Sequence, residues 1–281
     1  MRQERALTYS ILDPTGNITA LVESPAELSR QPEIAAAIMR RHPAVEQVGF
    51  LSRSPDGADV QGELRMAGGE FCGNASMCAA ALILMQTGPA DGAAQLRLRV
   101  SGAARPVEVS LIREGEDCFR AEILMPPARE IFSAMLMFGE LRGEVPLVRM
   151  QGISHLIVGT DSVFFSLLKD RPAAERAVRA FCTGLGAEGL GMLFLDGRGA
   201  DMCLTPLVFV PGSGTVFWEN SCASGSAAAG MFYAAGSGAA VELSLHEPGG
   251  VLRVYSDPKR GETRLTGRVR YLERCELPES E

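Results

Sequence analysis

The predicted fold depends on the stretch Phe71-Cys72-Gly73-Asn74-Ala75-Ser76-Met77-Cys78, which places a cysteine at the start of a run of small and apolar residues. A second stretch, Ser221-Cys222-Ala223-Ser224-Gly225-Ser226, repeats this arrangement about half a chain length later. The runs that follow, 79–85 and 227–235, predict two buried helices. A strand pattern precedes each cysteine. The sequence therefore predicts a duplicated fold in which two equivalent helix starts face each other across a cleft.

Composition and charge exclude several classes of protein. Of the 281 residues, 46% are hydrophobic and 22% are charged, as in a globular protein. The net charge of −7, with scattered lysines and arginines, argues against a nucleic-acid partner. The longest apolar run, 77–85, is too short to span a membrane, and the charged start of the chain with a break at Asp13-Pro14 predicts no signal peptide. We therefore expect a cytoplasmic protein without a membrane or nucleic-acid partner.

The seven cysteines are an odd set with irregular spacing and no C-x-x-C pair. This pattern predicts neither a disulfide framework nor a zinc site, and no other metal site is predicted. Cys72 and Cys222 stand apart because their surroundings match. The others are expected to be small core or surface residues: Cys78, Cys118, Cys182, Cys203 and Cys275.

The remaining patterns also repeat in two halves. A strand, a turn and a strand over 7–23 open the first half, and a helix over 26–41 follows. The second half has the same order, with strands at 147–150 and 155–158 and a helix at 171–184. We expect an α+β fold of two pseudo-symmetric domains, each a curved and mostly antiparallel sheet around a central helix. The expected domains are 1–127, completed by the last strand at 267–275, and 128–266, with Pro126-Pro127 as the linker.

A cysteine at the start of a helix has distinctive chemistry. Unpaired backbone N–H groups and the helix dipole favour the thiolate and lower the pKa of the thiol. The same N–H groups bind anions, and small residues let a carboxylate approach them closely. Both cysteines occupy such a position, and Asn74 and Ser224 are also good capping residues.

Two such sites facing each other would hold one carboxylate, with a sulfur on either side of the adjacent α-carbon. One thiolate can remove the α-proton while the opposite thiol delivers a proton to the other face. Stabilisation of the carbanion by the helix-end donors must supply most of the acceleration. Such a site inverts stereochemistry without a cofactor.

Several spaced stretches resemble the diaminopimelate epimerase and proline racemase superfamily and, within it, the histidine racemases of opine-type metallophore pathways. The resemblance runs in the same order through nearly the whole chain and implies two mirrored diaminopimelate epimerase-like domains with the active site in the cleft between them. The stretches that carry it are Pro14-Thr15-Gly16-Asn17, Glu46-Gln47-Val48-Gly49-Phe50, Glu70-Phe71-Cys72-Gly73-Asn74-Ala75, Trp218-Glu219-Asn220-Ser221-Cys222 and His246-Glu247-Pro248-Gly249-Gly250.

The resemblance implies a cofactor-independent racemase that converts L-histidine to D-histidine with Cys72 and Cys222 as its two bases. Glu219 is expected to meet the substrate ammonium, and Glu46 a basic side chain such as imidazole. The full set of residues expected to bind the substrate is Asn17, Glu46, Gln47, Gly73, Asn74, His155, Glu219, Ala223, Ser224 and Gly225.

The sequence also departs from the superfamily pattern. Ala223 replaces the usual glycine after the second cysteine, and Ile153 stands where an asparagine usually precedes the second-half histidine, His155. The arginine-bearing Glu-Arg-Gly stretch of the epimerase is missing before the second cysteine. A second, distal carboxylate would lack its partner, which counts against diaminopimelate.

Three alternatives remain. The protein can be a diaminopimelate epimerase or a racemase of another amino acid. It can be a non-catalytic amino-acid-binding protein or one regulated by a disulfide between the paired cysteines, although binding alone does not need two thiols. An isomerase of the phenazine-biosynthesis type is disfavoured because its chemistry uses carboxylates where this chain has cysteines. Since dimers are common in such proteins, a homodimer is a further expectation.

Overall fold

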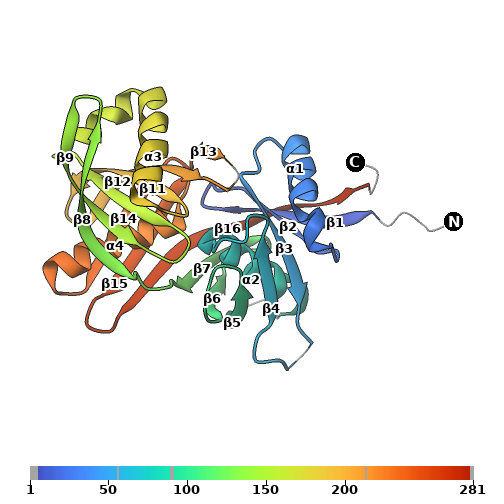
Figure 1. Ribbon diagram of the computed structural model, residues 1–281. Coiled ribbons are helices and arrows are strands. Elements are labelled where there is room, and N and C mark those ends of the chain that lie inside the picture. Colours follow the sequence, from blue (N-terminus) through green and yellow to red (C-terminus); the bar gives the residue numbers. More distant parts are fainter. Residues whose placement is uncertain (1–5, 56, 89–91, 213, 279–281) are drawn as a thin grey trace. The chain divides into compact units, whose positions relative to one another are not determined.

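The computed structural model describes residues 6–55, 57–88, 92–212 and 214–278, and its contacts divide the chain into two units. Unit 1 consists of Met1–Leu124 and Thr266–Glu281, and unit 2 of Met125–Leu265. Figure 1 shows their elements in sequence colours. The last strand, β16 (Glu262–Leu277), begins in unit 2 and continues into unit 1. The charged start on which the signal-peptide prediction partly rested, residues 1–5, lies outside the described residues.

The strands of unit 1 form a sheet that closes on itself. Its order is β1-β2-β3-β4-β5-β6-β7-β16, and β1 also pairs with β16. Most neighbouring strands are antiparallel, but β2–β3 and β4–β5 are parallel, and a helix lies in the connection of each parallel pair. The bounds of the strands are β1 (Leu7–Pro14), β2 (Thr19–Val22), β3 (Gln47–Arg53), β4 (Gly62–Met66), β5 (Ala93–Val100), β6 (Val107–Arg113) and β7 (Cys118–Leu124).

Unit 1 has a central helix and a peripheral one. The central helix α2 (Gly73–Thr87) is buried continuously from Gly73 to Leu84 and contacts strands β1 to β7, as an all-round apolar helix requires. The peripheral helix α1 (Gln31–Arg41) follows a short 3-10 turn, η1 (Leu28–Arg30), and packs its apolar side against β1 to β3. The predicted helix over 26–41 thus begins later than expected, with a proline in its first turn.

Unit 2 contains the same kinds of element as unit 1. Its strands follow the order β16-β15-β14-β12-β11-β10-β9-β8, with β13 paired to β12. The parallel pairs are β10–β11, connected through α3, and β12–β14, connected through α4. The bounds are β8 (Glu130–Phe138), β9 (Leu141–Arg149), β10 (Ser154–Gly159), η2 (Val163–Lys169), α3 (Arg171–Leu185), β11 (Leu190–Arg198), β12 (Asp201–Val210), β13 (Thr215–Trp218), α4 (Ala223–Ser237), β14 (Val241–Glu247) and β15 (Gly250–Asp257).

The element order of the two units matches. The series β2-α1-β3-β4-α2-β5-β6-β7 corresponds to β10-α3-β11-β12-α4-β14-β15-β16, with β13 as an addition. Strands dominate both series, and each has one buried helix that begins at a cysteine. This confirms the predicted α+β fold of two similar halves. Across the described ranges, no helix has the length and apolar character needed to cross a membrane.

Candidate active site

Both cysteines are the capping residues of their buried helices. Cys72 has extended backbone angles, φ −132° and ψ 115°, and its Sγ accepts the N–H of Ala75 at 3.4 Å. Cys222 has φ −125° and ψ 95°, and its Sγ accepts the N–H of Gly225 at 3.4 Å. Asn74 and Ser224, which are also good capping residue types, do not act as caps, because both lie within the first helical turn, whereas a cap has extended backbone angles.

Gln47 connects Cys72 to strand β2. The thiol of Cys72 donates to Oε1 of Gln47 at 2.9 Å. The Nε2 group of Gln47 donates to the hydroxyl of Thr19 at 2.8 Å and also to Oδ1 of Asn17. Thr19 and Gln47 face each other in the register of the parallel strands β2 and β3. The parallel pair therefore places the amide of Gln47 beside the first cysteine.

Asn17 and Glu46 extend this network. Asn17 follows the turn after β1, in which Thr15 and Gly16 have positive φ angles of 59° and 95°. The buried Asn17 side chain donates from Nδ2 to Oε2 of Glu46 at 2.6 Å. Four predicted site residues of unit 1 are thus joined in one chain of hydrogen bonds, in the order Glu46, Asn17, Gln47 and Cys72. The predicted residues Gly73 and Asn74 lie beside it as the first two residues of α2, and both are buried.

Ser224 and His155 lie next to the second cysteine. The Sγ of Cys222 is 3.7 Å from Oγ of Ser224, and that hydroxyl is 3.0 Å from Nε2 of His155. His155 is fully buried, and burial lowers the pKa of its imidazole to about 3, so the ring is neutral. Ala223 and Gly225 complete the first turn of α4, and the N–H of Gly225 is the one that Cys222 accepts.

A glycine makes room for the His155 ring. His155 in β10 faces Gly191 in β11, and a Cβ at Gly191 would lie 2.3 Å from Nδ1 of His155. Nδ1 has no hydrogen-bond partner among the described residues. Since orphaned buried N–H donors are rarer than orphaned acceptors, we assign the ring proton to Nε2, where it donates to Ser224. The hydroxyl of Ser224 can then donate toward the sulfur of Cys222.

Two carboxylates act on the second cysteine. Burial, followed by Glu219 and Glu247, raises the pKa of the Cys222 thiol well above its ordinary value, while the N–H of Gly225 lowers it by a smaller amount. The prediction that the helix start lowers the pKa is therefore wrong for Cys222, because burial and like charge outweigh the helix end. Glu219, predicted to bind the substrate ammonium, is thus brought close to Cys222.

Glu247 is the site residue that the sequence did not single out for a role. It ends β14, is 7% exposed, and its Oε2 accepts the N–H of Cys222 at 2.6 Å. Its Oε1 accepts the hydroxyl of Ser226. Burial raises the pKa of Glu247 to about 8, although these two hydrogen bonds lower it. The alternation of the strand could have indicated that Glu247 is buried, since Leu243, Leu245 and Glu247 occupy successive inward positions of β14.

Other residues considered in the sequence lie outside this arrangement. Trp218 stacks on Phe194 at 5.9 Å and donates to Glu175 at 2.9 Å, so it packs at the edge of the unit 2 core. His246 lies on the exposed side of β14, 3.1 Å from Asp201. His42 bonds the hydroxyl of Tyr9 at 2.8 Å. Of the remaining cysteines, Cys78 and Cys182 are buried and Cys203 is exposed.

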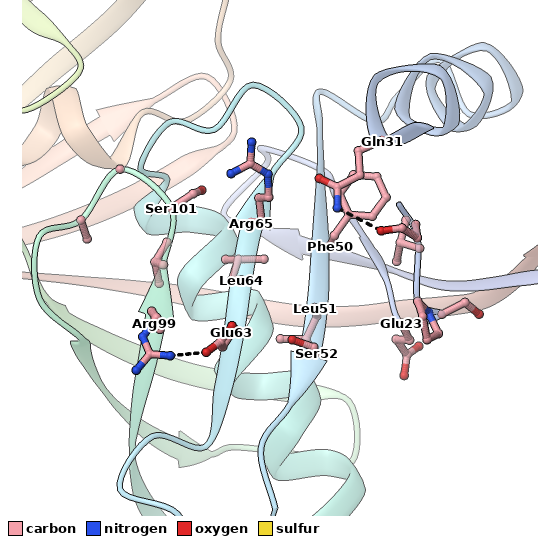
Figure 2. A pocket seen from close by; sticks show the side chains of 17 residues that line it. Glu23, Gln31, Phe50, Leu51, Ser52, Glu63, Leu64, Arg65, Arg99 and Ser101 are labelled. Carbon is pink, nitrogen blue, oxygen red and sulfur yellow. Dashed lines mark hydrogen bonds and ion pairs between the residues drawn. The ribbon is translucent and has the colours of Figure 1, made fainter. Parts of the chain in front are cut away.

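A separate hollow of about 610 Å³ lies in unit 1 (Figure 2). Phe50 and Arg65 line it, and Arg99 forms an ion pair with Glu63 on its wall. Its link to the first cysteine is indirect: Ser101 donates to the carbonyl of Glu70 at 2.8 Å, two residues before Cys72. None of the predicted site residues lines this hollow, so it is distinct from the cysteine sites.

Solved structures share this fold. A predicted epimerase from Pseudomonas aeruginosa is 19% identical with a TM-score of 0.66, covering 96% of this chain and 99% of that one. A probable proline racemase from Agrobacterium radiobacter K84 is 12% identical with a TM-score of 0.67, covering 97% and 93%. The fold is thus that of the racemases and epimerases, and both units carry a cysteine at the start of their buried helix.

The family follows from the sequence itself. A histidine racemase from Staphylococcus aureus is 29% identical over 257 residues, which cover 90% of this chain and 89% of that protein. The model of the histidine racemase CntK N-terminal domain matches residues 6–271. The chain belongs to this family.

Proposed function

We propose that this protein interconverts L-histidine and D-histidine with Cys72 and Cys222 as its two bases and without a cofactor. One observation carries the proposal: in both units of a duplicated fold, a cysteine thiol caps a buried helix. Membership of the histidine racemase family supports both the racemase activity and the substrate. The protein is accordingly an isomerase.

The proposed chemistry assigns a role to each helix start. One sulfur, as the thiolate, removes the α-proton, and the other, as the thiol, delivers a proton to the opposite face. The substrate carboxylate is bound by first-turn N–H groups, those of Gly73 and Asn74 in α2 and those of Ala223 and Ser224 in α4. The N–H groups of Ala75 and Gly225 already point at the sulfurs and stabilise each thiolate as it forms.

Carboxylates on both units are proposed to recognise the charged groups of histidine. Glu219, which acts on Cys222, receives the α-ammonium. Glu46, joined to Cys72 through Asn17 and Gln47, receives the imidazole. His155 orients Ser224, and its neutral ring adds no positive charge to the site. A cysteine outside any disulfide at each helix start suits a reducing compartment, so we place the reaction in the cytoplasm.

Exchange of the α-proton in D₂O tests the proposal. The protein is incubated with L-histidine and a reductant, and NMR and chiral chromatography follow deuterium at the α-carbon and the appearance of D-histidine. We expect exchange with inversion. Cys72→Ala and Cys222→Ala should each lower racemisation by about 10² to 10⁴-fold, since each removes one acid–base group.

The exposed Cys203 provides the matched control, because Cys203→Ala removes a thiol that has no place in the proposed chemistry. Alanine, proline and diaminopimelate are run beside histidine. Racemisation that survives the loss of either Cys72 or Cys222 would contradict the two-thiol mechanism. Inversion of another amino acid but not of histidine would overturn the substrate and keep the reaction.

A further inference from the structure

The hydrogen bonds around Cys72 have a fixed direction. Glu46 is a carboxylate, which can only accept, so the group that Asn17 turns toward it must be the donating Nδ2. The Oδ1 of Asn17 then faces Gln47 and must receive the donating Nε2 of that residue. This leaves Oε1 of Gln47, an acceptor, facing the sulfur of Cys72 at 2.9 Å.

A second contact fixes the same direction independently. The hydroxyl of Thr19 donates its proton to the carbonyl of Asn17 at 2.9 Å, within a fully buried position. Having used its proton, the hydroxyl can only accept from Gln47, and it does so from Nε2 at 2.8 Å. Two separate contacts, one starting at Glu46 and one at Thr19, therefore hold the amide of Gln47 in one orientation.

The orientation of the Gln47 amide favours one protonation state of the Cys72 sulfur. An amide oxygen held against sulfur is satisfied only when the sulfur carries a proton, because a thiolate there would leave two acceptors facing each other. The N–H of Ala75, 3.4 Å from the same sulfur, favours the thiolate, but the amide oxygen of Gln47 is the nearer group. Glu46 lies at the far end of this chain, and its negative charge acts in the same direction as the amide. The thiol of Cys78 also interacts with Cys72 and Thr19, but burial first of all raises its pKa well above the ordinary value, so it stays neutral.

We propose that Gln47, held in place by Thr19 and by Glu46 through Asn17, is a positioning residue that keeps Cys72 in the thiol form, the state from which it delivers a proton. This inference rests on the proposed racemase function. In that step the S–H bond of Cys72 breaks, a C–H bond forms at the α-carbon, and the electron pair of the carbanion is used in the new bond. Cys72 is left as a thiolate, which must regain a proton before the next delivery.

Labelling of the free protein with iodoacetamide tests the proposal, because only the thiolate reacts. Peptide mass spectrometry reads the labelling rate of Cys72 from pH 6 to 10, with the Cys222 peptide as the internal reference. Gln47→Met keeps the length of the side chain but removes the amide, and the pH of half-maximal labelling at Cys72 should fall by about one unit. Gln47→Glu keeps an acceptor at the same place and adds charge, so the same midpoint should rise.

The two contacts that hold Gln47 are separated by a double-mutant cycle. Thr19→Val and Glu46→Gln each leave one contact that holds the amide. Thr19→Val alone should leave the Cys72 midpoint nearly unchanged, and Glu46→Gln alone should lower it only by the small amount due to the lost charge. Together they free the amide to turn Nε2 toward the sulfur, and the midpoint should fall as it does in Gln47→Met. Circular dichroism, which reports both units, verifies that each variant is folded.

Two results would overturn the inference: midpoints that move in the same direction in Gln47→Met and Gln47→Glu, or a double variant that behaves like either single one. The variants Thr19→Val and Glu46→Gln keep the test decisive even if a Gln47 variant unfolds. No substrate is present in these measurements. A protein that fails to racemise histidine yet shows these midpoints would contradict the proposed function and leave the role of Gln47 standing.

Discussion

Glu247 shows how a single buried carboxylate can change the properties of a thiol, that of Cys222. It lies behind the helix start, bonded to the N–H of Cys222 and to Ser226, and above about pH 8, where it is ionised, its charge adds to that of Glu219 in disfavouring the thiolate. In unit 1 the corresponding strand, β5, ends at the apolar Val100, and the serine equivalent to Ser226 donates instead to the carbonyl of Cys72 at 2.7 Å. The two cysteines thus have different electrostatic surroundings in matching folds.

Replacing this carboxylate should make Cys222 more reactive. In Glu247→Gln the amide retains an acceptor for the N–H of Cys222 while the charge is lost, so the pKa of Cys222 should fall. We expect its labelling by iodoacetamide at pH 9.5, where Glu247 is ionised, to be faster by about 10-fold, which corresponds to a shift of one pH unit. Glu247→Asp keeps the charge and serves as the control. Equal labelling of Cys222 in wild type and Glu247→Gln would show that the carboxylate only caps the helix.

Residue patterns predicted some of this site and missed the rest. Four residues expected to belong to the site, Cys72, Gln47, Asn17 and Glu46, are joined by hydrogen bonds, and their role stays a prediction. Glu247 was missed because its role depends on the register of β14 against the start of α4, and no local pattern reports a contact between residues 222 and 247. Which groups donate and which accept around Gln47 likewise became clear only from the contacts.

The helices and strands differ in how far sequence predicts them. The buried helices were located by their small residues but are longer than predicted, Gly73–Thr87 and Ala223–Ser237, because the first turn begins directly after the cysteine cap. Strand β8 (Glu130–Phe138) was not predicted, since its apolar residues run on with little alternation. Parallel pairing of β10 with β11, which brings His155 over Gly191, depends on a helical crossover that the strand patterns alone do not reveal.

The parallel pairing of β10 with β11 can be tested by a substitution at Gly191. Gly191→Ala would place a methyl group 2.3 Å from Nδ1 of the buried His155, so the ring or the strand must move. We expect a loss of about 1–3 kcal/mol in the free energy of unfolding, measured by denaturant titration, and a lower racemisation rate because Ser224 loses its partner.

Gly184 in α3 is the matched control, since nothing lies within 4 Å of a Cβ built there. Gly184→Ala should raise the free energy of unfolding by about 0.5–1 kcal/mol, as expected when alanine replaces glycine inside a helix. If Gly191→Ala were as stable and as active as the wild type, the close packing of strand and ring described here would be wrong.

For the molecule as a whole, the single tryptophan makes the stability of one unit measurable by itself. Trp218 packs at the core edge of unit 2, so its fluorescence during denaturation reports that unit, while circular dichroism reports both. Two buried groups of unit 2 titrate differently in the folded and unfolded states at moderate pH. They are His155, whose pKa is lowered from 6.5 to about 3, and Glu247, whose pKa is raised from 4.5 to about 8.

The signs of the two effects determine the pH profile. Below pH 6.5 the unfolded state binds a proton at His155 that the folded state does not, so stability from this group is lost as the pH falls from 6.5 toward 3. Between pH 4.5 and 8 the folded state holds a proton at Glu247 that the unfolded state has released, so stability is lost as the pH rises through this range. From pH 4.5 to 6.5 the two effects oppose each other and nearly cancel.

We therefore expect the free energy of unfolding of unit 2 to be level from about pH 4.5 to 6.5 and to fall on either side, by about 1.4 kcal/mol per pH unit for each uncompensated proton. Glu247→Gln removes one of the opposing effects. In that variant the stability should rise from about pH 4.5 to 6.5, driven by His155 alone, and then stay level to about pH 8. Guanidinium titrations followed by Trp218 fluorescence give both profiles. A wild type that is level up to pH 8 would mean that Glu247 is ionised at neutral pH, with its hydrogen bonds to Cys222 and Ser226 outweighing its burial.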